Sequence, residues 1–172
     1  MSGTAVYIPR RLIQRLREEG LDLVDLLISA LSRASKLDPR DAAEARLELA
    51  EKFLGEAREY VASGDAVQAS EKLYKAVEEC IKALAEALKV PELKAVERRG
   101  RWDTWLLGSA ARSLAKKLGE ARVEFAWAVA YDVHVWGFHE AKYGIDKVKM
   151  DLPHAEWLLE YARRVLRQAG SA

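Results

Sequence analysis

A short stretch in the last third of the chain holds the side chains best suited to chemistry. It reads HVWGFHE over residues 134–140, and Asp132 and His134 are the strongly polar interruptions of the apolar run 125–138. Buried titratable groups destabilise a fold unless they find partners. We therefore expect a ligand, a subunit interface or a neighbouring helix to satisfy the polar groups, namely Asp132, His134, Trp136 and His139.

Helical geometry separates these side chains, because positions seven apart nearly coincide in direction whereas positions two apart do not. One stripe carries Asp132, Trp136 and His139, and the other carries Trp127, Tyr131, His134 and Phe138. Five residues on an α-helix correspond to about 140° of rotation, whereas metal-binding histidines on one face stand four apart. His134 and His139 are thus not expected to chelate, and we predict neither a metal site nor a cofactor.

Two residues of this stretch leave alternatives open. Asp132 can accept a hydrogen bond from the Trp136 indole or act with His139 on a bound water or ligand. Equally, the polar groups can be core residues that neighbouring helices or a second subunit satisfy. Gly137 lowers helix stability by about 1 kcal/mol relative to alanine, so it indicates either a helix end or a close backbone approach.

A second candidate site is electrostatic. Residues 94–117 contain seven basic and two acidic side chains, and Arg98, Arg99 and Arg101 stand beside Trp102. Guanidiniums next to an aromatic face can hold a phosphate while a base stacks. The alternative is a solvated loop followed by an ordinary helix surface. A glycine-rich phosphate loop of the Walker or dinucleotide type is absent from the sequence.

Helix punctuation predicts the elements that position these residues. Pro9 opens a first helical stretch that Gly20 interrupts, and Asp38-Pro39 is typical of an N-cap with proline at the first helical position. The run Ser63-Gly64-Asp65 supplies a C-terminal glycine and a new N-cap, which predicts a tight helical hairpin. The inward face of its first arm is expected to hold Ala42, Ala45, Leu49, Phe53, Ala57 and Tyr60.

The second arm is expected to bury residues at three- and four-residue spacing, namely Ala69, Leu73, Ala76, Cys80, Leu84 and Leu88. Its outer face is expected to hold Glu71, Lys75, Glu78, Lys82 and Glu86. Residues 89–100 are interpreted as a loop. Further helices are predicted at about 103–118, with Trp105 inward, at about 120–138, and from near Pro153 onward. The helix 120–138 is apolar on nearly all sides, which indicates enclosure by other helices or by a partner chain.

Together these patterns predict an all-α fold, an antiparallel bundle of five to six helices in one domain over residues 1–172. Residues 1–37 form a helical extension and 38–172 the core. The chain has 28 basic and 27 acidic residues and one cysteine, and it lacks a signal peptide pattern and a spanning apolar segment. We therefore expect a cytoplasmic protein that does not enter membranes. The absence of asparagine indicates a thermophilic source.

Two motifs carry a resemblance to a known family. The segment SGDAVQASEKLYKAVEE at 63–79, followed by HVWGFHE at 134–140, resembles the archaeal PaREP family of hyperthermophiles, with the likeness extending over about 39–165. That family is similar to HEPN helical domains, which accompany nucleotidyltransferases and include RNA-cleaving toxins. The resemblance implies a HEPN-like core that is often dimeric, with nucleotide or RNA contact.

The catalytic motif of HEPN nucleases is missing, because no arginine stands at the required distance before His134, His139 or His154. We therefore expect a non-catalytic homodimer that binds a nucleotide or RNA-type phosphate ligand. His134 and His139 are the expected polar anchors and Trp136 the stacking or packing group. Two alternatives remain: a protein-interaction scaffold that partners a nucleotidyltransferase, and a divergent RNase with His134 or His139 as general base.

Overall fold

The computed structural model of the chain describes residues 3–169. These residues form eight α-helices and one π-helix, and strands are absent among them. The helices are α1 (Arg10–Glu18), α2 (Leu23–Arg33), α3 (Pro39–Ser63), α4 (Ala66–Leu88), α5 (Leu93–Arg99), α6 (Thr104–Leu118), α7 (Arg122–Val133), η1 (His134–His139) and α8 (Ile145–Ala169). The predicted all-α bundle is confirmed.

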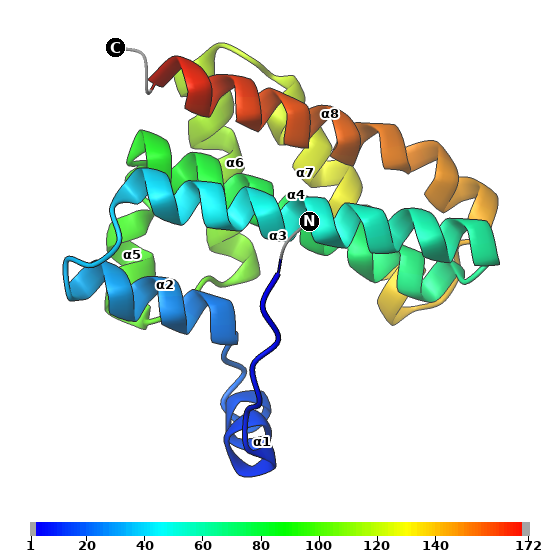
Figure 1. Cartoon of the computed structure of the whole chain (residues 1–172). Helices are drawn as coiled ribbons and strands as arrows, with labels where there is room; N and C mark the ends of the chain where they lie inside the picture. Colours follow the sequence, from blue (N-terminus) through cyan, green and yellow to red (C-terminus); the bar gives the residue numbers. More distant parts are fainter. Residues whose placement is uncertain (1–2, 170–172) are drawn as a thin grey trace.

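The antiparallel hairpin of α3 and α4 forms the centre of the bundle (Figure 1). Asp38 caps α3, since its Oδ1 accepts hydrogen bonds from the backbone N–H groups of Arg40 and Asp41 at 2.8 Å. Gly64 ends the helix in the left-handed conformation with φ +80°, and Asp65 then caps α4 through the N–H of Gln68. The predicted hairpin is confirmed, because its signals are local.

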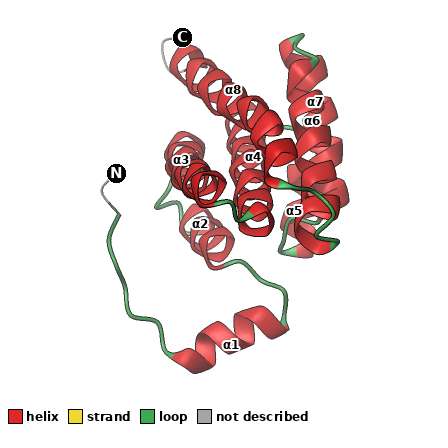
Figure 2. Ribbon diagram, turned by 90° about the vertical axis from the view of Figure 1, so that its right-hand side faces the viewer, coloured by secondary structure: helices red, strands yellow, loops and turns green. Residues whose placement is uncertain are grey.

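Helix α4 is the buried element around which the others pack. It contacts α3 and α8 on one side and α6, α7 and η1 on the other, and in Figure 2 α6 and α7 form a separate layer beside it. Leu73, Val77, Ile81 and Leu84 lie fully inside. Each such side chain contributes roughly 1.5–3 kcal/mol by leaving water, so the core fixes α4 and with it the surfaces of α6, α7 and η1.

The predicted inward face of α4 is confirmed, since Ala69, Leu73, Ala76, Cys80 and Leu84 are buried, but one residue of its outer face and part of the face predicted for α3 are wrong. On α3 the buried positions include Ala43, Leu47 and Leu54, while Ala45 is exposed, so the inward face is rotated from the predicted one. On α4, Lys82 was expected outside but is only 1% exposed. The reason is that α2 brings an acidic partner to this side, which the helix period alone does not show.

Three predicted boundaries and exposures also differ from the structure. The loop expected at 89–100 contains α5, and the last helix begins at Ile145, eight residues before Pro153. Pro153 lies inside α8, where it removes one backbone hydrogen bond instead of opening the helix. Trp105, expected inward, is 62% exposed.

The N-terminal part stands apart from the bundle. Helix α1 has no buried residue. It follows an extended segment and lies apart from the other helices, as Figures 1 and 2 both show. Helix α2 lies against α3, with Ile28 buried. Within residues 3–169, the helices lack the length and apolarity that crossing a membrane requires.

Candidate functional site

The backbone changes from α-helical to π-helical at His134, and this change brings the two histidines together. Residues 134–139 form η1, where the hydrogen bonds close over five residues, as the Glu140 N–H to Val135 carbonyl bond of 2.9 Å shows. The Nε2 atoms of His134 and His139 lie 3.0 Å apart. The prediction that these histidines point in different directions is therefore wrong, because it assumed a regular α-helix.

Gly137 marks the place where η1 presses against α4. A Cβ atom at this position would lie 2.8 Å from Cβ of Ser70 and closer still to its Oγ. The Ser70 hydroxyl is itself fixed, since it donates to the Ala66 carbonyl at 2.6 Å. Of the two explanations that the sequence left open, the close backbone approach is realised, and the π-helix also ends two residues later.

His134 is held by side chains of α4. Its Nδ1 lies 3.2 Å from Oε2 of Glu71, and its ring stacks on Tyr74 with centroids 3.9 Å apart. Partial burial favours the neutral form of Glu71, but the hydrogen bond to His134 and the charge of Lys75 outweigh it, so the pKa of Glu71 lies below its usual value. Glu71, His134 and the exposed His139 thus form a carboxylate–imidazole–imidazole chain that ends at the surface.

Asp132 and Trp136 take other roles than those considered from the sequence. Asp132 Oδ2 accepts a hydrogen bond of 2.6 Å from the hydroxyl of Tyr143, in the loop before α8, instead of bonding to Trp136 or His139. Trp136 is 46% exposed, and Phe125 and Tyr131 are exposed as well. The helix 120–138 is therefore not enclosed on all sides within one chain.

A surface groove of about 710 Å³ runs beside this helix, between α6, α7 and the segment after α5. It is lined by Arg99, Asp103, Thr104, Trp105, Gly108, Arg112, Trp127 and Tyr131. The rings of Trp127 and Tyr131 stack at 6.2 Å with an angle of 18° between their planes. Gly108 leaves room for this stack, since a Cβ there would lie 3.1 Å from Nε1 of Trp127.

Of the three arginines expected to contact a phosphate, only Arg99 lines the groove. Arg99 forms an ion pair with Asp103 and lies 6.0 Å from the Trp105 ring. Arg101 pairs with the same Asp103 at 3.0 Å. Arg98 is exposed and has no partner among residues 3–169. Arg112 also lines the groove, and its Nε lies 3.0 Å from Glu124.

The histidines and the groove are separate but connected. His134 and His139 do not line the groove. Tyr74 joins the two sites, because its ring stacks on His134 and lies 5.7 Å from the Trp127 ring. The structure thus brings Arg99 to the side of the fifth predicted helix, and it places the histidine pair one turn beyond Tyr131 on that same helix.

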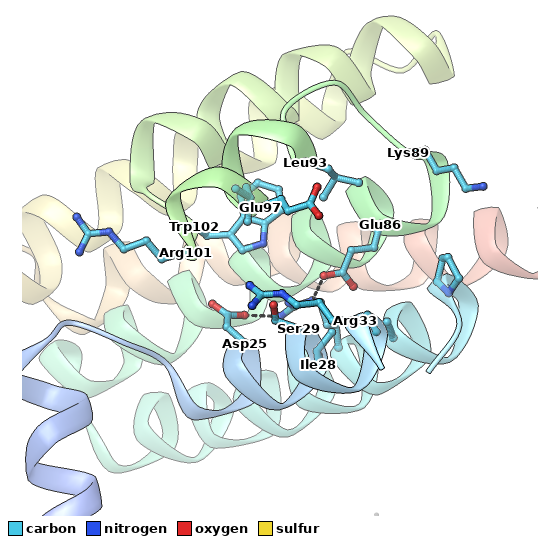
Figure 3. A pocket seen from close by; sticks show the side chains of 16 residues that line it. Asp25, Ile28, Ser29, Arg33, Glu86, Lys89, Leu93, Glu97, Arg101 and Trp102 are labelled. Carbon is cyan, nitrogen blue, oxygen red and sulfur yellow. Dashed lines mark hydrogen bonds and ion pairs between the residues drawn. The ribbon is translucent and has the colours of Figure 1, made fainter. Parts of the chain in front are cut away.

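A second cavity, of about 290 Å³, lies between α2, α3, α5 and the end of α4 (Figure 3). Arg101 and Trp102 line it, but the Arg101 guanidinium points away from the cavity in Figure 3. The sequence analysis did not identify this cavity. It arises where α2 covers the core, and α2 contributes Ile28 and Ser29 to its wall.

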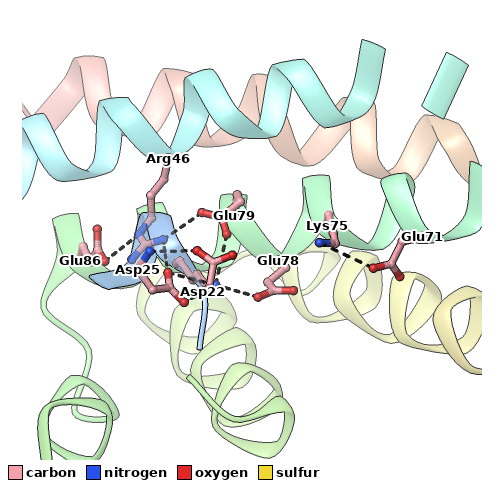
Figure 4. A network of polar contacts seen from close by, with 9 residues as sticks. Asp22, Asp25, Arg46, Glu71, Lys75, Glu78, Glu79 and Glu86 are labelled. Carbon is pink, nitrogen blue, oxygen red and sulfur yellow. Dashed lines mark hydrogen bonds and ion pairs between the residues drawn. The ribbon is translucent and has the colours of Figure 1, made fainter. Parts of the chain in front are cut away.

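Beside this cavity lies a buried ion network that sequence reasoning also missed (Figure 4). Arg46 is 2% exposed, and its guanidinium contacts Asp25 at 2.7 Å, Glu79 at 2.9 Å and Glu86 at 2.7 Å. Lys82 contacts Asp25 at 3.0 Å. Arg46 stands between Ala43, Leu47 and Ala50 on the buried face of α3, so a correct assignment of that face would have revealed it.

Burial has opposite net effects on the acids of this network. It favours the neutral form of Asp25, but Lys82 and Arg46 outweigh it and lower the pKa of Asp25. For Glu79 and Glu86 burial prevails over the nearby cations, and their pKa values are raised. The network contains more carboxylates than cations, so one of these glutamates retains a proton more readily than a free glutamate does.

The described residues offer no obvious metal site. Groups of three or more His, Cys, Asp or Glu side chains that could hold an ion are absent from residues 3–169. Cys80 is fully buried, which raises the pKa of its thiol and leaves it as an apolar core residue.

Comparison with known proteins places the chain in a family. The sequence profile described as archaeal PaREP1/PaREP8 family matches residues 45–159. The chain belongs to this family. The matched PaREP1/PaREP8 region begins within α3 and ends within α8, so it contains the groove, the histidine pair and four members of the ion network, whereas α1 and α2 lie outside it.

Two solved structures share the PaREP1/PaREP8 fold seen here. The crystal structure of a Sulfolobus solfataricus protein, an NESG target, has a TM-score of 0.62 and 35% identity, covering 68% of this chain and 95% of that chain. The solution structure of the same target has a TM-score of 0.61 and 34% identity, covering 68% and 90%. No curated protein matches the chain.

Proposed function

We propose that the chain binds a phosphate-bearing ligand, a nucleotide or an RNA-type strand, in the groove between α6 and α7. The observation that carries the proposal is that aromatic rings and two guanidiniums line the same groove. Trp105 is exposed beside Arg99, the Trp127–Tyr131 stack forms the wall, and Arg112 stands on the rim. Bases stack on such rings while arginines hold the backbone.

The energetics of the groove favour exchange of its present ion pairs for a phosphate. Arg112 and Glu124 are both largely exposed, and exposed pairs contribute about 0–1 kcal/mol. A phosphate can accept two parallel hydrogen bonds from the Arg112 guanidinium, and it then binds more strongly than Glu124, which accepts one from Nε. Arg99 shares Asp103 with Arg101, so Asp103 still has a cationic partner when Arg99 turns to a ligand.

The proposal is tested by fluorescence anisotropy with labelled ATP and labelled short RNA at low salt. Trp105→Ala should weaken binding roughly tenfold, because base stacking on an aromatic ring contributes about 1–3 kcal/mol. Phe125→Ala is the matched control, since Phe125 is an exposed aromatic residue of α7 outside the groove. If neither probe binds at low salt, the proposed function is wrong.

The arginines are tested separately. Alanine at Arg98, Arg99 and Arg101 together should weaken binding and reduce its salt dependence, because each phosphate contact releases counterions. Binding that is unchanged in this triple variant excludes the end of α5 and the segment after it as a phosphate site. The expected homodimer and a nucleotidyltransferase partner stay predictions that the oligomeric state and co-purification of the full chain test.

A second candidate function, a divergent RNase, is favoured by the Glu71–His134–His139 chain. Its imidazoles are placed so that His139 can take a proton from a ribose hydroxyl while Glu71 orients His134. RNA cleavage in the presence of EDTA that disappears in both His139→Gln and His134→Gln supports this activity. Intact RNA after incubation with the wild-type protein rejects it and leaves the histidines as binding groups.

A further inference from the structure

The N-terminal arm, residues 3–19, is a feature that the proposed function does not yet use. It consists of an extended segment and α1, and it projects from the bundle without burying any residue of α1 (Figures 1 and 2). It also lies outside the region that the PaREP1/PaREP8 profile matches. An ordered helix that adds nothing to the core needs another explanation.

The apolar side of α1 is partly covered within the arm and its base. Ile8, Leu12, Leu16, Leu21 and Leu23 gather around a small groove of about 240 Å³. All of them except Leu12 are half-buried. This local cluster orients the helix, and it leaves the polar side of α1 to face solvent.

The polar side of α1 presents arginines without partners. Arg15 forms ion pairs with Glu18 and Glu19. In contrast, Arg10, Arg11 and Arg17 are exposed and lack a hydrogen-bonding or ionic partner among residues 3–169. Unpaired guanidiniums on a protruding arm are suited to backbone phosphates, which accept hydrogen bonds from them in pairs.

The base of the arm adjoins Arg101, which shares an acidic partner with Arg99 of the groove. Gly20 turns the chain with φ +63°, and a Cβ there would lie 3.8 Å from Nη1 of Arg101. Arg101 pairs with Asp103, which also pairs with Arg99 in the groove. Arg101 therefore links Asp103 in the groove to the turn at Gly20 from which the arm projects.

We infer that the ligand of the groove is a single-stranded oligonucleotide, and that the arm holds the phosphates of the nucleotides that extend beyond the groove through Arg10, Arg11 and Arg17. This inference rests on the proposed function and narrows its ligand, because a mononucleotide in the groove cannot also reach α1. Tyr7, which is 88% exposed just before α1, provides a ring on which a further base stacks.

The test compares the triple variant R10A/R11A/R17A of the full chain with a matched control. K147A/K149A/R164A also removes three exposed positive charges, all of them from α8. The probes are ATP and oligouridines of about 4 and about 12 nucleotides, lengths within the range of known single-strand sites. Circular dichroism checks that each variant folds, which α1 should not affect because it buries no residue.

The arm variant should bind the long oligouridine at least tenfold more weakly, while ATP and the short oligouridine bind as they do to the parent. The salt slope for the long probe should fall by about 2, because three single-strand phosphate contacts each contribute about 0.7. The control variant K147A/K149A/R164A should change the affinity for the long oligouridine and its salt slope by less than the arm variant does. If Trp105→Ala weakens the long probe and the arm variant does not, the arm assignment is overturned and the proposed function stands.

Two other occupants of the arm give different outcomes. If the arm variant loses binding to vesicles of anionic phospholipid while its affinity for the long oligouridine is unchanged, the arm contacts a lipid surface and the inference is overturned. If the arm variant changes from dimer to monomer in light scattering without a change in oligouridine affinity, the arm contacts a second copy, which also overturns it. Absence of binding by every probe to the parent protein rejects the proposed function itself.

Discussion

The Nε2 atoms of His134 and His139 face each other across 3.0 Å. They can do so because the backbone from His134 to His139 is a π-helix, since an α-helix would separate the two side chains by about 140°. The same segment brings Gly137 against Ser70 of α4. The π-helix therefore places Gly137 against α4 and also brings the two imidazole rings together.

Replacing Gly137 by alanine should destabilise the protein by about 1–3 kcal/mol, a typical cost of overpacking. The added methyl group would meet Ser70, whose side chain is fixed by the Ala66 carbonyl. Urea denaturation measures the loss. Gly108→Ala is a milder comparison, because its nearest neighbour would be the Trp127 ring at 3.1 Å. A Gly137→Ala protein as stable as the parent would contradict the close contact.

The hydrogen bonds of the histidine pair predict their tautomers. Because Glu71 accepts a hydrogen bond from Nδ1–H of His134, the Nε2 of His134 is left to accept a hydrogen bond from Nε2–H of His139. At a pH where both rings are neutral, ¹⁵N NMR should show the Nδ1–H form for His134 and the Nε2–H form for His139. Glu71→Ala should remove the preference at His134. A parent protein with His134 in the Nε2–H form would disprove the arrangement.

Asp132 should control the ionisation of Tyr143. The hydrogen bond from the Tyr143 hydroxyl to Asp132, with smaller effects of burial and charge, raises the pKa of Tyr143 to about 12. Asp132→Asn removes the negative charge, so the pKa of Tyr143 should fall toward the usual value of about 10. Titration followed by NMR of the tyrosine ring carbons measures the shift. Glu124→Gln, a change of the same charge elsewhere on α7, should leave Tyr143 unaffected.

The buried ion network should respond unequally to loss of its acids. Asp25 holds both Arg46 and Lys82, and its pKa is lowered, so Asp25→Asn should destabilise the fold by about 3 kcal/mol, as for other broken buried pairs. Glu86 binds Arg46 through one oxygen, while its Oε2 is buried without a partner. Glu86→Gln should therefore change the free energy of unfolding by less than about 1 kcal/mol. Equal losses in the two variants would contradict this ordering.

The raised pKa of Glu86 also predicts how the comparison varies with pH. A carboxyl group that protonates more easily in the folded chain stabilises it below the unfolded pKa of about 4.3, and this contribution is lost as the pH rises through the folded pKa. Glu86→Gln lacks this term. The variant should gain stability relative to the parent as the pH rises from about 4 through the raised pKa of Glu86. A difference in stability that does not change as the pH rises above about 4 would contradict the direction of the shift.

Helix ends were predicted from the sequence where their signals are local. Asp38 and Asp65 cap the helices that their positions indicate, and Gly64 ends α3, because each acts through backbone groups within four residues. Pro153 misled because proline occurs both at helix starts and, at a cost, inside helices. The choice depends on the packing of α8 against α4, which the sequence does not display.

The candidate site was predicted only in part, for reasons of geometry. The residue types were informative, since His134 and His139 form a pair and Arg99 lines the groove. Their spatial relation was not, because sequence analysis assumed an α-helical period where the chain is π-helical. Lys82 was misplaced for a different reason: its partner Asp25 lies 57 residues away in α2.

Asp25 makes the second helix an integral part of the folded body, although it lies outside the segment shared with relatives. Without α2, Arg46 and Lys82 would lose Asp25. They would then face Glu79 and Glu86 beside a gap that water can enter. Shortened versions of this chain that still fold should accordingly begin near Gly20, which separates the arm, whose helix buries no residue, from α2, which holds the ion network. A chain that begins at the start of α3 would lack Asp25 as well as the arm.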